Sequence, residues 1–223
     1  MVINTNTSSQ TSARMLKEST SMLAKSLSRL SSGSKIISPE DDAAGLAVST
    51  RFDAQINRIA AANQNVNNAI SFNQTQDGFL QKVGKALDRM SELTILSQDV
   101  TKSDDDRALY NTEFTTLGAY VDDVATKQFN GVDLFTGAVL DVTTDSDGTT
   151  YSMTGVDVTA AAYTTATAST VDTNANAVTA LTNVKAAIEQ LATDRANIGA
   201  NISRLSSTSG TLTVLKGTVL LPQ

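Results

Sequence analysis

Apolar side chains recur along two long stretches of the chain with alternating spacings of three and four residues. This spacing puts them on one narrow stripe of a helix, and a long stripe is typical of helices that pack side by side in a coiled coil or rod-like bundle. We therefore predict a mainly α fold, an elongated antiparallel helical rod. The predicted seam of the rod consists of Ile56, Ile59, Val66, Ile70, Leu80, Leu87, Leu181, Val184, Ile188, Leu191, Ile198, Ile202 and Leu205.

The first helix of the rod has a start signal at Ser38-Pro39, because serine can cap a helix and proline suits its first position. We predict that this helix runs to about Gln98. Two charged residues, Asp77 and Arg195, occupy seam positions of the two stripes. Isolated polar residues in such a seam set the register between helices, so we interpret this pair as structural rather than catalytic.

A second capped start lies at Ser103, where Asp106 follows three residues later as in a capping box. The helix that it opens should end near Gln128, and the short connection makes it an antiparallel hairpin with the preceding helix. The last long helix should begin near Thr173 or Asn174. The rod is thus predicted to comprise residues 39–128 and 175–216.

Between these helices the pattern changes to alternation and turn signals. Asn130-Gly131 is a strong hairpin turn, and we predict one or two β-hairpins between Gly131 and Thr159. Residues 141–174 are rich in threonine, and no Lys or Arg occurs between Lys127 and Lys185. We expect residues 129–174 to form a small β-hairpin module with an acidic, solvated, Thr-rich insert at the tip of the rod.

The N-terminal segment, residues 1–38, carries a weaker helical stripe among many Ser and Thr residues of modest helix propensity. We expect it to be disordered in the monomer and helical only when a partner covers its stripe. Residues 217–223 should form a C-terminal tail. The N-terminal stripe consists of Met15, Leu16, Met22, Leu23, Leu27 and Leu30.

Composition argues against several function classes. The net charge of −6 disfavours binding to nucleic acids or anionic membranes, and there is no Cys or His for thiol, histidine or common zinc chemistry. No signal peptide and no membrane-length apolar run is apparent. The acidic turn ending at Gly148 fails as an EF-hand, since Thr143 and Thr154 stand where the anchoring carboxylates belong. We predict no enzyme activity, catalytic residue, metal or cofactor.

Several motifs, in order along the chain, resemble the bacterial flagellin family. They are Arg29–Gly33, Asp41–Ala47 and Phe129–Gly131 in the first part, and Arg195–Asn201 and Ser203–Leu205 near the other end. The resemblance covers roughly residues 1–140 and 175–216. It implies a structural subunit that polymerises into the filament used for swimming motility, with the chain's terminal helices forming the filament core.

The resemblance also implies partners and a location. A flagellin is exported by the flagellar type III machinery with the help of a chaperone, without a cleaved signal, and joins a helical homopolymer outside the cell. Filament cap and junction proteins are the other implied partners. Residues that a vertebrate Toll-like receptor contacts in this family correspond to Arg89, Leu93 and Glu113.

One departure from the family is expected to matter. Flagellins normally continue well beyond the region of Leu212–Lys216 in an amphipathic helix that pairs with the N-terminal one, whereas this sequence ends at Gln223. A truncated product, a divergent minor subunit and a filament core built mainly of N-terminal helices are open explanations. A hook–filament junction protein, a helical signalling fragment and a carboxylate enzyme are the alternative functions.

Overall fold

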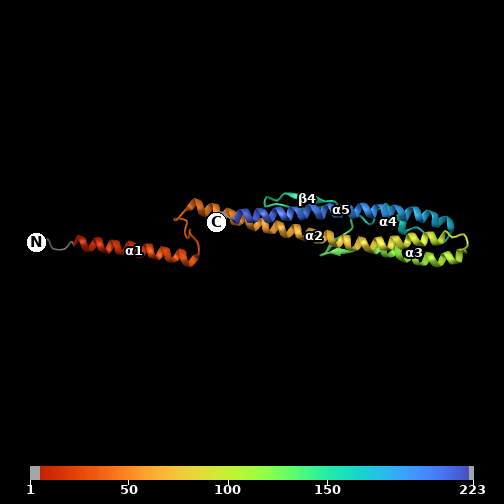
Figure 1. Ribbon diagram of the computed structural model, residues 1–223, viewed down its shortest axis with the longest axis horizontal. Coiled ribbons are helices and arrows are strands. Elements are labelled where there is room, and N and C mark those ends of the chain that lie inside the picture. Colours follow the sequence, from red (N-terminus) through yellow and green to blue (C-terminus); the bar gives the residue numbers. More distant parts are fainter. Residues whose placement is uncertain (1–5, 221–223) are drawn as a thin grey trace. The chain divides into compact units, whose positions relative to one another are not determined.

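The computed structural model describes residues 6–220, which fall into two compact units that divide between Gln55 and Ile56. The prediction of a mainly α chain with a small β module is confirmed (Figure 1). The elements are α1 (Thr7–Ser32), α2 (Ala43–Ser97), α3 (Asp104–Val124), β1 (Gln128–Phe129), β2 (Val132–Asp133), β3 (Leu140–Thr143), β4 (Thr150–Met153), α4 (Ala161–Thr167) and α5 (Asn174–Leu220).

The first unit contains α1, whose two ends are capped by side-chain and backbone chemistry. The Asn6 side chain accepts a hydrogen bond from the Ser9 amide at 3.1 Å, and Gly33 ends the helix in the left-handed conformation with φ of 66°. No residue of α1 is buried. Its dependence on a partner for order stays a prediction.

Helix α2 begins at Ala43, so the predicted start at Ser38-Pro39 is wrong. Ser38 instead opens a turn, in which its carbonyl accepts the Asp41 amide at 3.0 Å. The N-terminal cap is Asp42, whose carboxylate accepts the Gly45 amide at 2.8 Å. The other end of α2, at Ser97, lies one residue from the prediction.

The second unit is an antiparallel helical rod in which early residues of α2 meet late residues of α5. Asn63 donates to the Ser209 carbonyl at 3.3 Å, and the Arg195 guanidinium contacts the Asp77 carboxylate at 2.8 Å. Every residue of the predicted seam is buried or half-buried. The two charged seam residues therefore pair with each other across the helices.

The buried face of α2 is wider than the predicted seam. Phe72, Val83, Met90 and other residues outside the three-four stripe are also buried. The reason is that α3 and the hairpins pack on α2 beside α5, and their residues share one core with it. A narrow apolar stripe is expected where a helix packs against one partner, whereas α2 packs against several elements.

Helix α3 folds back along α2 as the sequence predicts. The Ser103 hydroxyl accepts the Asp106 amide while the Asp106 carboxylate accepts the Ser103 amide, which confirms the capping box. The helix ends at Val124 rather than near Gln128. The residues that follow leave the helix because Gln128 already belongs to strand β1.

Two antiparallel hairpins follow, in agreement with the prediction of one or two. Strands β1 and β2 flank Asn130-Gly131, whose φ angles of 51° and 80° are both positive, as a type I′ turn requires. Strands β3 and β4 pair in the register Leu140↔Met153 to Thr143↔Thr150. Their turn closes on the Asp145 carboxylate, which accepts the amides of Asp147 and Thr149 at 2.8 and 2.9 Å.

The expected solvated insert at the tip of the rod is wrong, because residues 141–174 pack along the helices. Val142 and Met153 lie in a core cluster with residues of α2 and α5, and Figure 1 shows β4 beside α5. The unpredicted helix α4 buries Tyr163 and Ala166 completely. It lies so close to α3 that a Cβ on Gly118 would be 3.0 Å from the Thr167 carbonyl.

At the C-terminal end, α5 continues to Leu220, four residues past the predicted end of the rod at 216. The predicted tail therefore starts as helix, and Gly217 stands within it because a single glycine costs only about 1 kcal/mol there. Residues 221–223 lie outside the described part of the chain.

Candidate assembly surfaces

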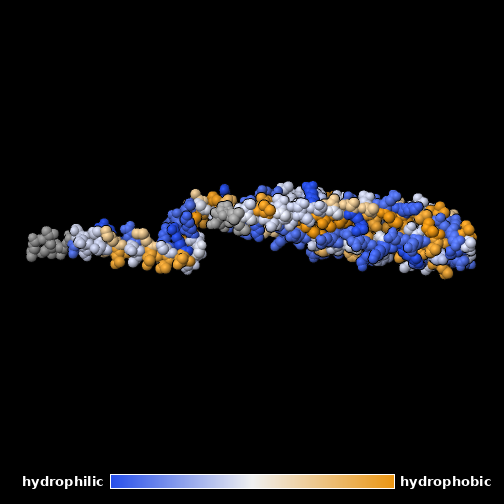
Figure 2. All heavy atoms as spheres, in the orientation of Figure 1, coloured by the Kyte–Doolittle hydropathy of each residue, from blue (hydrophilic) through white to orange (hydrophobic). Residues whose placement is uncertain are grey.

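The apolar face of α1 is the largest uncovered set of apolar side chains in the first unit. Its residues are 57 to 82 % exposed, and Figure 2 shows them gathered along one side of the helix. A contiguous apolar patch on a soluble protein usually marks an interaction site. The face consists of the predicted Met15, Leu16, Met22, Leu23, Leu27 and Leu30.

The charged side of α1 is tied to the loop before α2. Asp41 forms ion pairs with Lys25 and with Arg29, the latter at 3.4 Å, and its side chain is only 6 % exposed. The hydrogen bond from Lys25, aided by the Ile37 amide, lowers the pKa of the Asp41 carboxyl below its ordinary value. We call Lys25, Arg29 and Asp41 the Asp41 latch.

The latch joins the first two flagellin-like motifs of the sequence, Arg29–Gly33 and Asp41–Ala47. In the second motif, Gly45 lies against the capping side chain, since a Cβ on it would be 2.5 Å from the Asp42 carboxylate. The hydrophobic pattern of the sequence does not predict Asp41 as a contact residue. The available signal was the four-residue spacing of Lys25 and Arg29, which puts two cations on one side of a helix.

The predicted receptor-contact residues lie where α2 and α3 meet. Arg89 contacts Glu113 at 2.7 Å and Glu92 at 2.9 Å. The hydrogen bond from Arg89 lowers the pKa of Glu113. The prediction that Leu93 is a receptor contact is wrong for this structure. Leu93 is 0 % exposed and lies in the core, so its side chain is not part of an accessible surface. Arg89 and Glu113 alone of the three are accessible.

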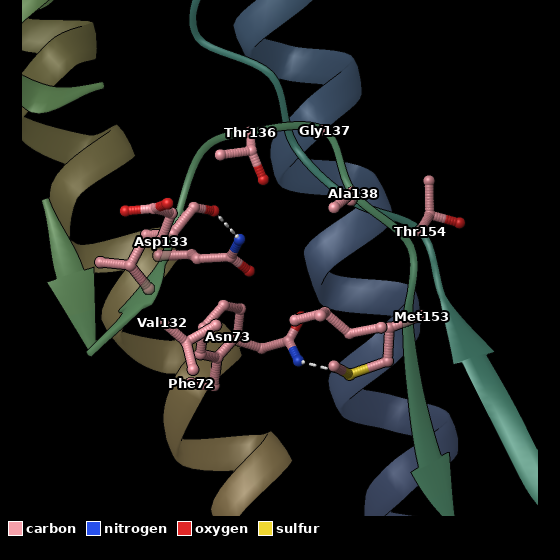
Figure 3. Close-up of a pocket in the computed structure, with 13 residues that line it drawn as sticks. Phe72, Asn73, Val132, Asp133, Thr136, Gly137, Ala138, Met153 and Thr154 are labelled. Atoms are coloured by element: carbon pink, nitrogen blue, oxygen red, sulfur yellow. Dashed lines mark hydrogen bonds between the residues drawn. The ribbon is translucent and has the colours of Figure 1, made fainter. Parts of the chain in front are cut away.

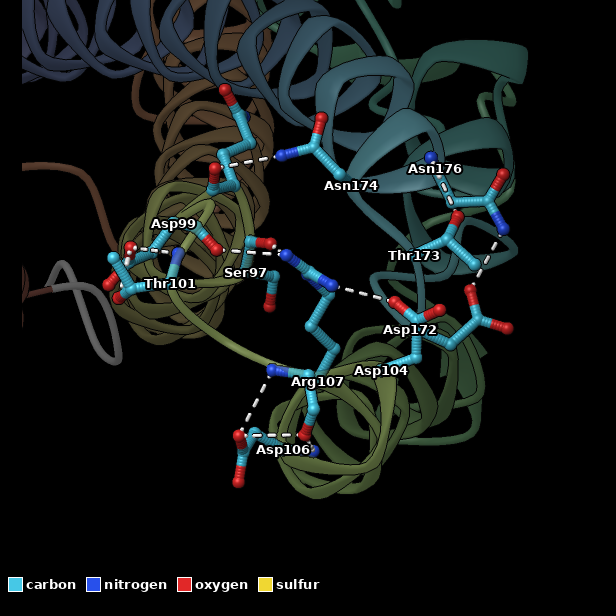
Figure 4. A network of polar contacts seen from close by, with 12 residues as sticks. Ser97, Asp99, Thr101, Asp104, Asp106, Arg107, Asp172, Thr173, Asn174 and Asn176 are labelled. Carbon is cyan, nitrogen blue, oxygen red and sulfur yellow. Dashed lines mark hydrogen bonds and ion pairs between the residues drawn. The ribbon is translucent and has the colours of Figure 1, made fainter.

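One end of the rod is closed by Arg107, which is buried although it is charged (Figure 4). Its guanidinium donates to the carbonyls of Ser97 and Asp99 at 2.7 and 2.8 Å and pairs with Asp104 at 2.6 Å. The side chain of Asn174 covers the Gln98 carbonyl at 2.8 Å. These donors bind the carbonyls of Ser97, the last residue of α2, and of the two residues that follow it.

A small pocket of about 150 Å³ lies between α2 and the two hairpins (Figure 3). Two of its polar side chains are bonded to the protein itself. Gln76 donates to the Leu134 carbonyl at 2.5 Å, and Asn73 donates to the Met153 sulfur at 3.0 Å. The pocket therefore anchors the hairpins on α2, and its lining offers no acid–base pair.

A buried polar contact fixes α4 on α5. The Tyr163 hydroxyl donates to the Asp194 carboxylate at 2.7 Å, and Gln190 donates to the other carboxylate oxygen at 2.9 Å. Burial, together with this hydrogen bond, raises the pKa of Tyr163 far above its ordinary value. Both partners are satisfied, so the contact holds the helices together rather than activating a proton.

Within residues 6–220, no His, Cys, Asp or Glu side chains form a group of three or more that could hold a metal ion. No helix of this part is long and apolar enough to cross a membrane.

Residues 3–139 match the family model described as the bacterial flagellin N-terminal helical region. The chain is 41 % identical over 138 residues to the flagellar filament 31.3 kDa core protein of Treponema maltophilum, an alignment that covers 61 % of this chain and 48 % of that protein. It is 37 % identical over 142 residues to a flagellin of Xenorhabdus nematophila, covering 63 % and 45 %. The chain thus spans about half the length of these curated relatives.

Solved structures give a consistent result. The crystal structure of Bacillus cereus flagellin superposes with a TM-score of 0.59 and 25 % identity, over 67 % of this chain and 88 % of that one. A putative flagellar hook-associated protein from Vibrio parahaemolyticus superposes with a TM-score of 0.68 over 82 % of this chain and 97 % of that one. Its 16 % identity shows a shared fold alone.

Proposed function

The chain belongs to the bacterial flagellin family, and we propose that it is a structural subunit that polymerises into the flagellar filament for swimming motility. The observation that carries this proposal is the apolar face of α1. Six large apolar side chains lie along one helix, each more than half exposed, and no residue of that helix is buried.

Such a face favours association with other subunits. Burying a large apolar side chain contributes roughly 1.5–3 kcal/mol, so covering six of them favours association. A contact between this face and a different surface of the next copy is heterologous, and such contacts propagate as helical polymers when they do not close.

Location and partners follow from this proposal. A filament subunit acts outside the cell and is delivered by the flagellar type III export machinery, with a chaperone, and it adjoins cap and junction proteins. The family membership of residues 3–139 supports this assignment. Recognition by a Toll-like receptor stays a prediction, with Arg89 and Glu113 as the accessible residues.

The alternatives have weaker support. The fold shared with the hook-associated protein does not carry a junction function at 16 % identity. A signalling bundle would need helices without β modules between them, and this rod carries two hairpins.

The test is seeded assembly, in which fragments of flagella are added to the purified chain and growth is followed by negative-stain electron microscopy and sedimentation. Leu23→Asp places a charge on the apolar face of α1. Gln10→Asp is the matched control, because Gln10 is also exposed but lies roughly 140° around the helix from Leu23.

We expect filaments from the wild-type chain and from Gln10→Asp, and at least tenfold less sedimented protein from Leu23→Asp. If the two variants assembled equally, the apolar face of α1 would not be needed for assembly. Failure of the wild-type chain to elongate any seed would overturn the proposed function.

A further inference from the structure

We propose that Asp41 positions α1 for assembly by holding the charged side of this helix, so that its apolar face is directed away from the loop. The assembly consequence rests on the proposed function. The latch itself is a contact within one subunit and can be measured without any polymer.

The latch has the geometry of a specific contact. Lys25 and Arg29 are four residues apart, one turn of α1, and both ion-pair with the same Asp41 carboxylate oxygen. That carboxylate also accepts the Ile37 amide at 3.4 Å. Its side chain is nearly buried although α1 itself has no buried residue. The Asp41 carboxylate therefore joins the loop to α1.

The latch leaves the apolar face free. At 100° per residue, the direction midway between Lys25 and Arg29 lies roughly 120° around the helix from the centre of the apolar face. A tether on this side holds the helix without covering Leu23, Leu27 or Leu30, which are 57 to 82 % exposed. Holding α1 by its charged side thus leaves its apolar side free to contact a partner.

The two cations do not contribute equally. Lys25 is the nearer partner of Asp41, whereas the Arg29 Nη2 atom lies 3.4 Å away and the Arg29 Nε atom is buried without a hydrogen-bond partner. Lys25 is therefore the main partner, and Arg29, one turn from the Gly33 cap, secures the end of the helix.

A latch at this end affects how α1 becomes ordered. Starting a helix is unfavourable because several residues must be fixed before the first hydrogen bonds form. Asp41 fixes the last turn of α1 against the loop, next to the left-handed Gly33 that ends the helix. The C-terminal end of α1 is then the more ordered end, and order extends from it toward Thr7 when a partner covers the apolar face.

The direct test is amide hydrogen exchange, measured by mass spectrometry on the monomeric full chain. Asp41→Asn removes the charge and keeps the size of the side chain. Asp42→Asn is the matched control, because it changes the neighbouring carboxyl in the same way while asparagine still caps α2. Residues 8–20 of α1, beyond reach of the latch, are the internal reference.

We expect Asp41→Asn to raise the exchange rate of residues 26–33 at least threefold, with no change at residues 8–20 and none in Asp42→Asn. Lys25→Met should reproduce most of the effect. Raising the salt to about 1 M, where the Debye length is about 3 Å, should move the wild type toward Asp41→Asn and leave that variant unchanged.

Seeded elongation supplies the second measurement. On the same seeds, Asp41→Asn should elongate several-fold more slowly than Asp42→Asn. Equal exchange in Asp41→Asn and Asp42→Asn would overturn the latch, whatever the filaments do. If the exchange differs but no variant, wild type included, elongates, the latch stands and the proposed function fails. If the exchange differs and the two variants elongate equally, the positioning role is overturned.

Discussion

A buried hydrogen bond helps to hold α4 on the rod. Tyr163 is fully buried, and its hydroxyl donates to the nearly buried Asp194. Tyr163→Phe leaves one carboxylate oxygen without its donor, so we expect the free energy of unfolding to fall by about 1–3 kcal/mol. Thermal and urea unfolding followed by circular dichroism measure this change.

Tyr120→Phe is the control for that substitution, since Tyr120 lies exposed on α3. It should leave the unfolding midpoint unchanged. If both variants were equally stable, the Tyr163–Asp194 bond would contribute nothing to the rod.

The Asp77–Arg195 pair predicts a pH dependence. The hydrogen bond from Arg195 lowers the pKa of Asp77 in the folded chain. The stabilisation is therefore present above the unfolded-state pKa of about 3.9 and is lost as the pH falls through the folded-state value. Asp77→Asn should lower the urea midpoint at about pH 7, and this difference from the wild type should vanish as the pH falls through the folded-state value.

The exposed Asp88 on the same helix provides the comparison for that experiment. Asp88→Asn should leave the urea midpoint at about pH 7 unchanged. A difference between the wild type and Asp77→Asn that did not shrink in acid would contradict the ion-pair explanation.

At the residue level the sequence was informative where a position depends on local periodicity alone. The seam residues follow from three-four spacing, and the Ser103–Asp106 capping box from two residues of one helix turn. The start of α2 could not be predicted from local periodicity. Ser38 and Asp42 both suit a cap, and the choice depends on where Asp41 is held by Lys25 on another helix.

Among the elements, α5 contributes residues to both core clusters. Ile198 is 1 % exposed in the main core. Ile198→Ala should lower the free energy of unfolding by about 2–5 kcal/mol, because it removes buried methyl groups and leaves a cavity. Val178→Ala, half exposed on the same helix, should cost well under 1 kcal/mol. Equal costs in chemical unfolding would show that Ile198 does not face a packed core.

The element that sequence patterning missed is α4. It is seven residues long, it has no side-chain cap, and its composition of Ala and Thr is that of the surrounding insert. Its helical state comes from tertiary packing, with Tyr163 and Ala166 in the core and Gly118 allowing close approach to α3. No local signal specifies these contacts, so the segment was predicted as solvated.

This packing predicts the effect of replacing residues 160–172 with a Gly-Ser linker of equal length. The replacement removes the buried side chains of Tyr163, Ala166 and Val171 and opens the core between α3 and α5. Deleting one buried aromatic side chain alone costs about 3–5 kcal/mol. We expect the cooperative thermal transition to broaden or disappear. An unchanged transition would show that the rod does not need the packing of residues 160–172.

At the scale of the whole molecule, the described chain consists of a packed unit and a unit whose long helix α1 buries none of its residues. The family match spans residues of both units, from 3 to 139. The central claim is that copies of the same chain in a filament cover the apolar face of α1.

Site-specific labelling tests that claim most directly, because the chain has no cysteine and a single introduced thiol is a unique reporter. Leu30→Cys lies on the apolar face at a position that is 82 % exposed in the subunit. The rate of its reaction with a maleimide would be measured in the monomer and in seeded filaments. We expect at least a tenfold slower reaction in the filaments. Equal rates in both states would contradict the account, because the face would then stay open to water after assembly.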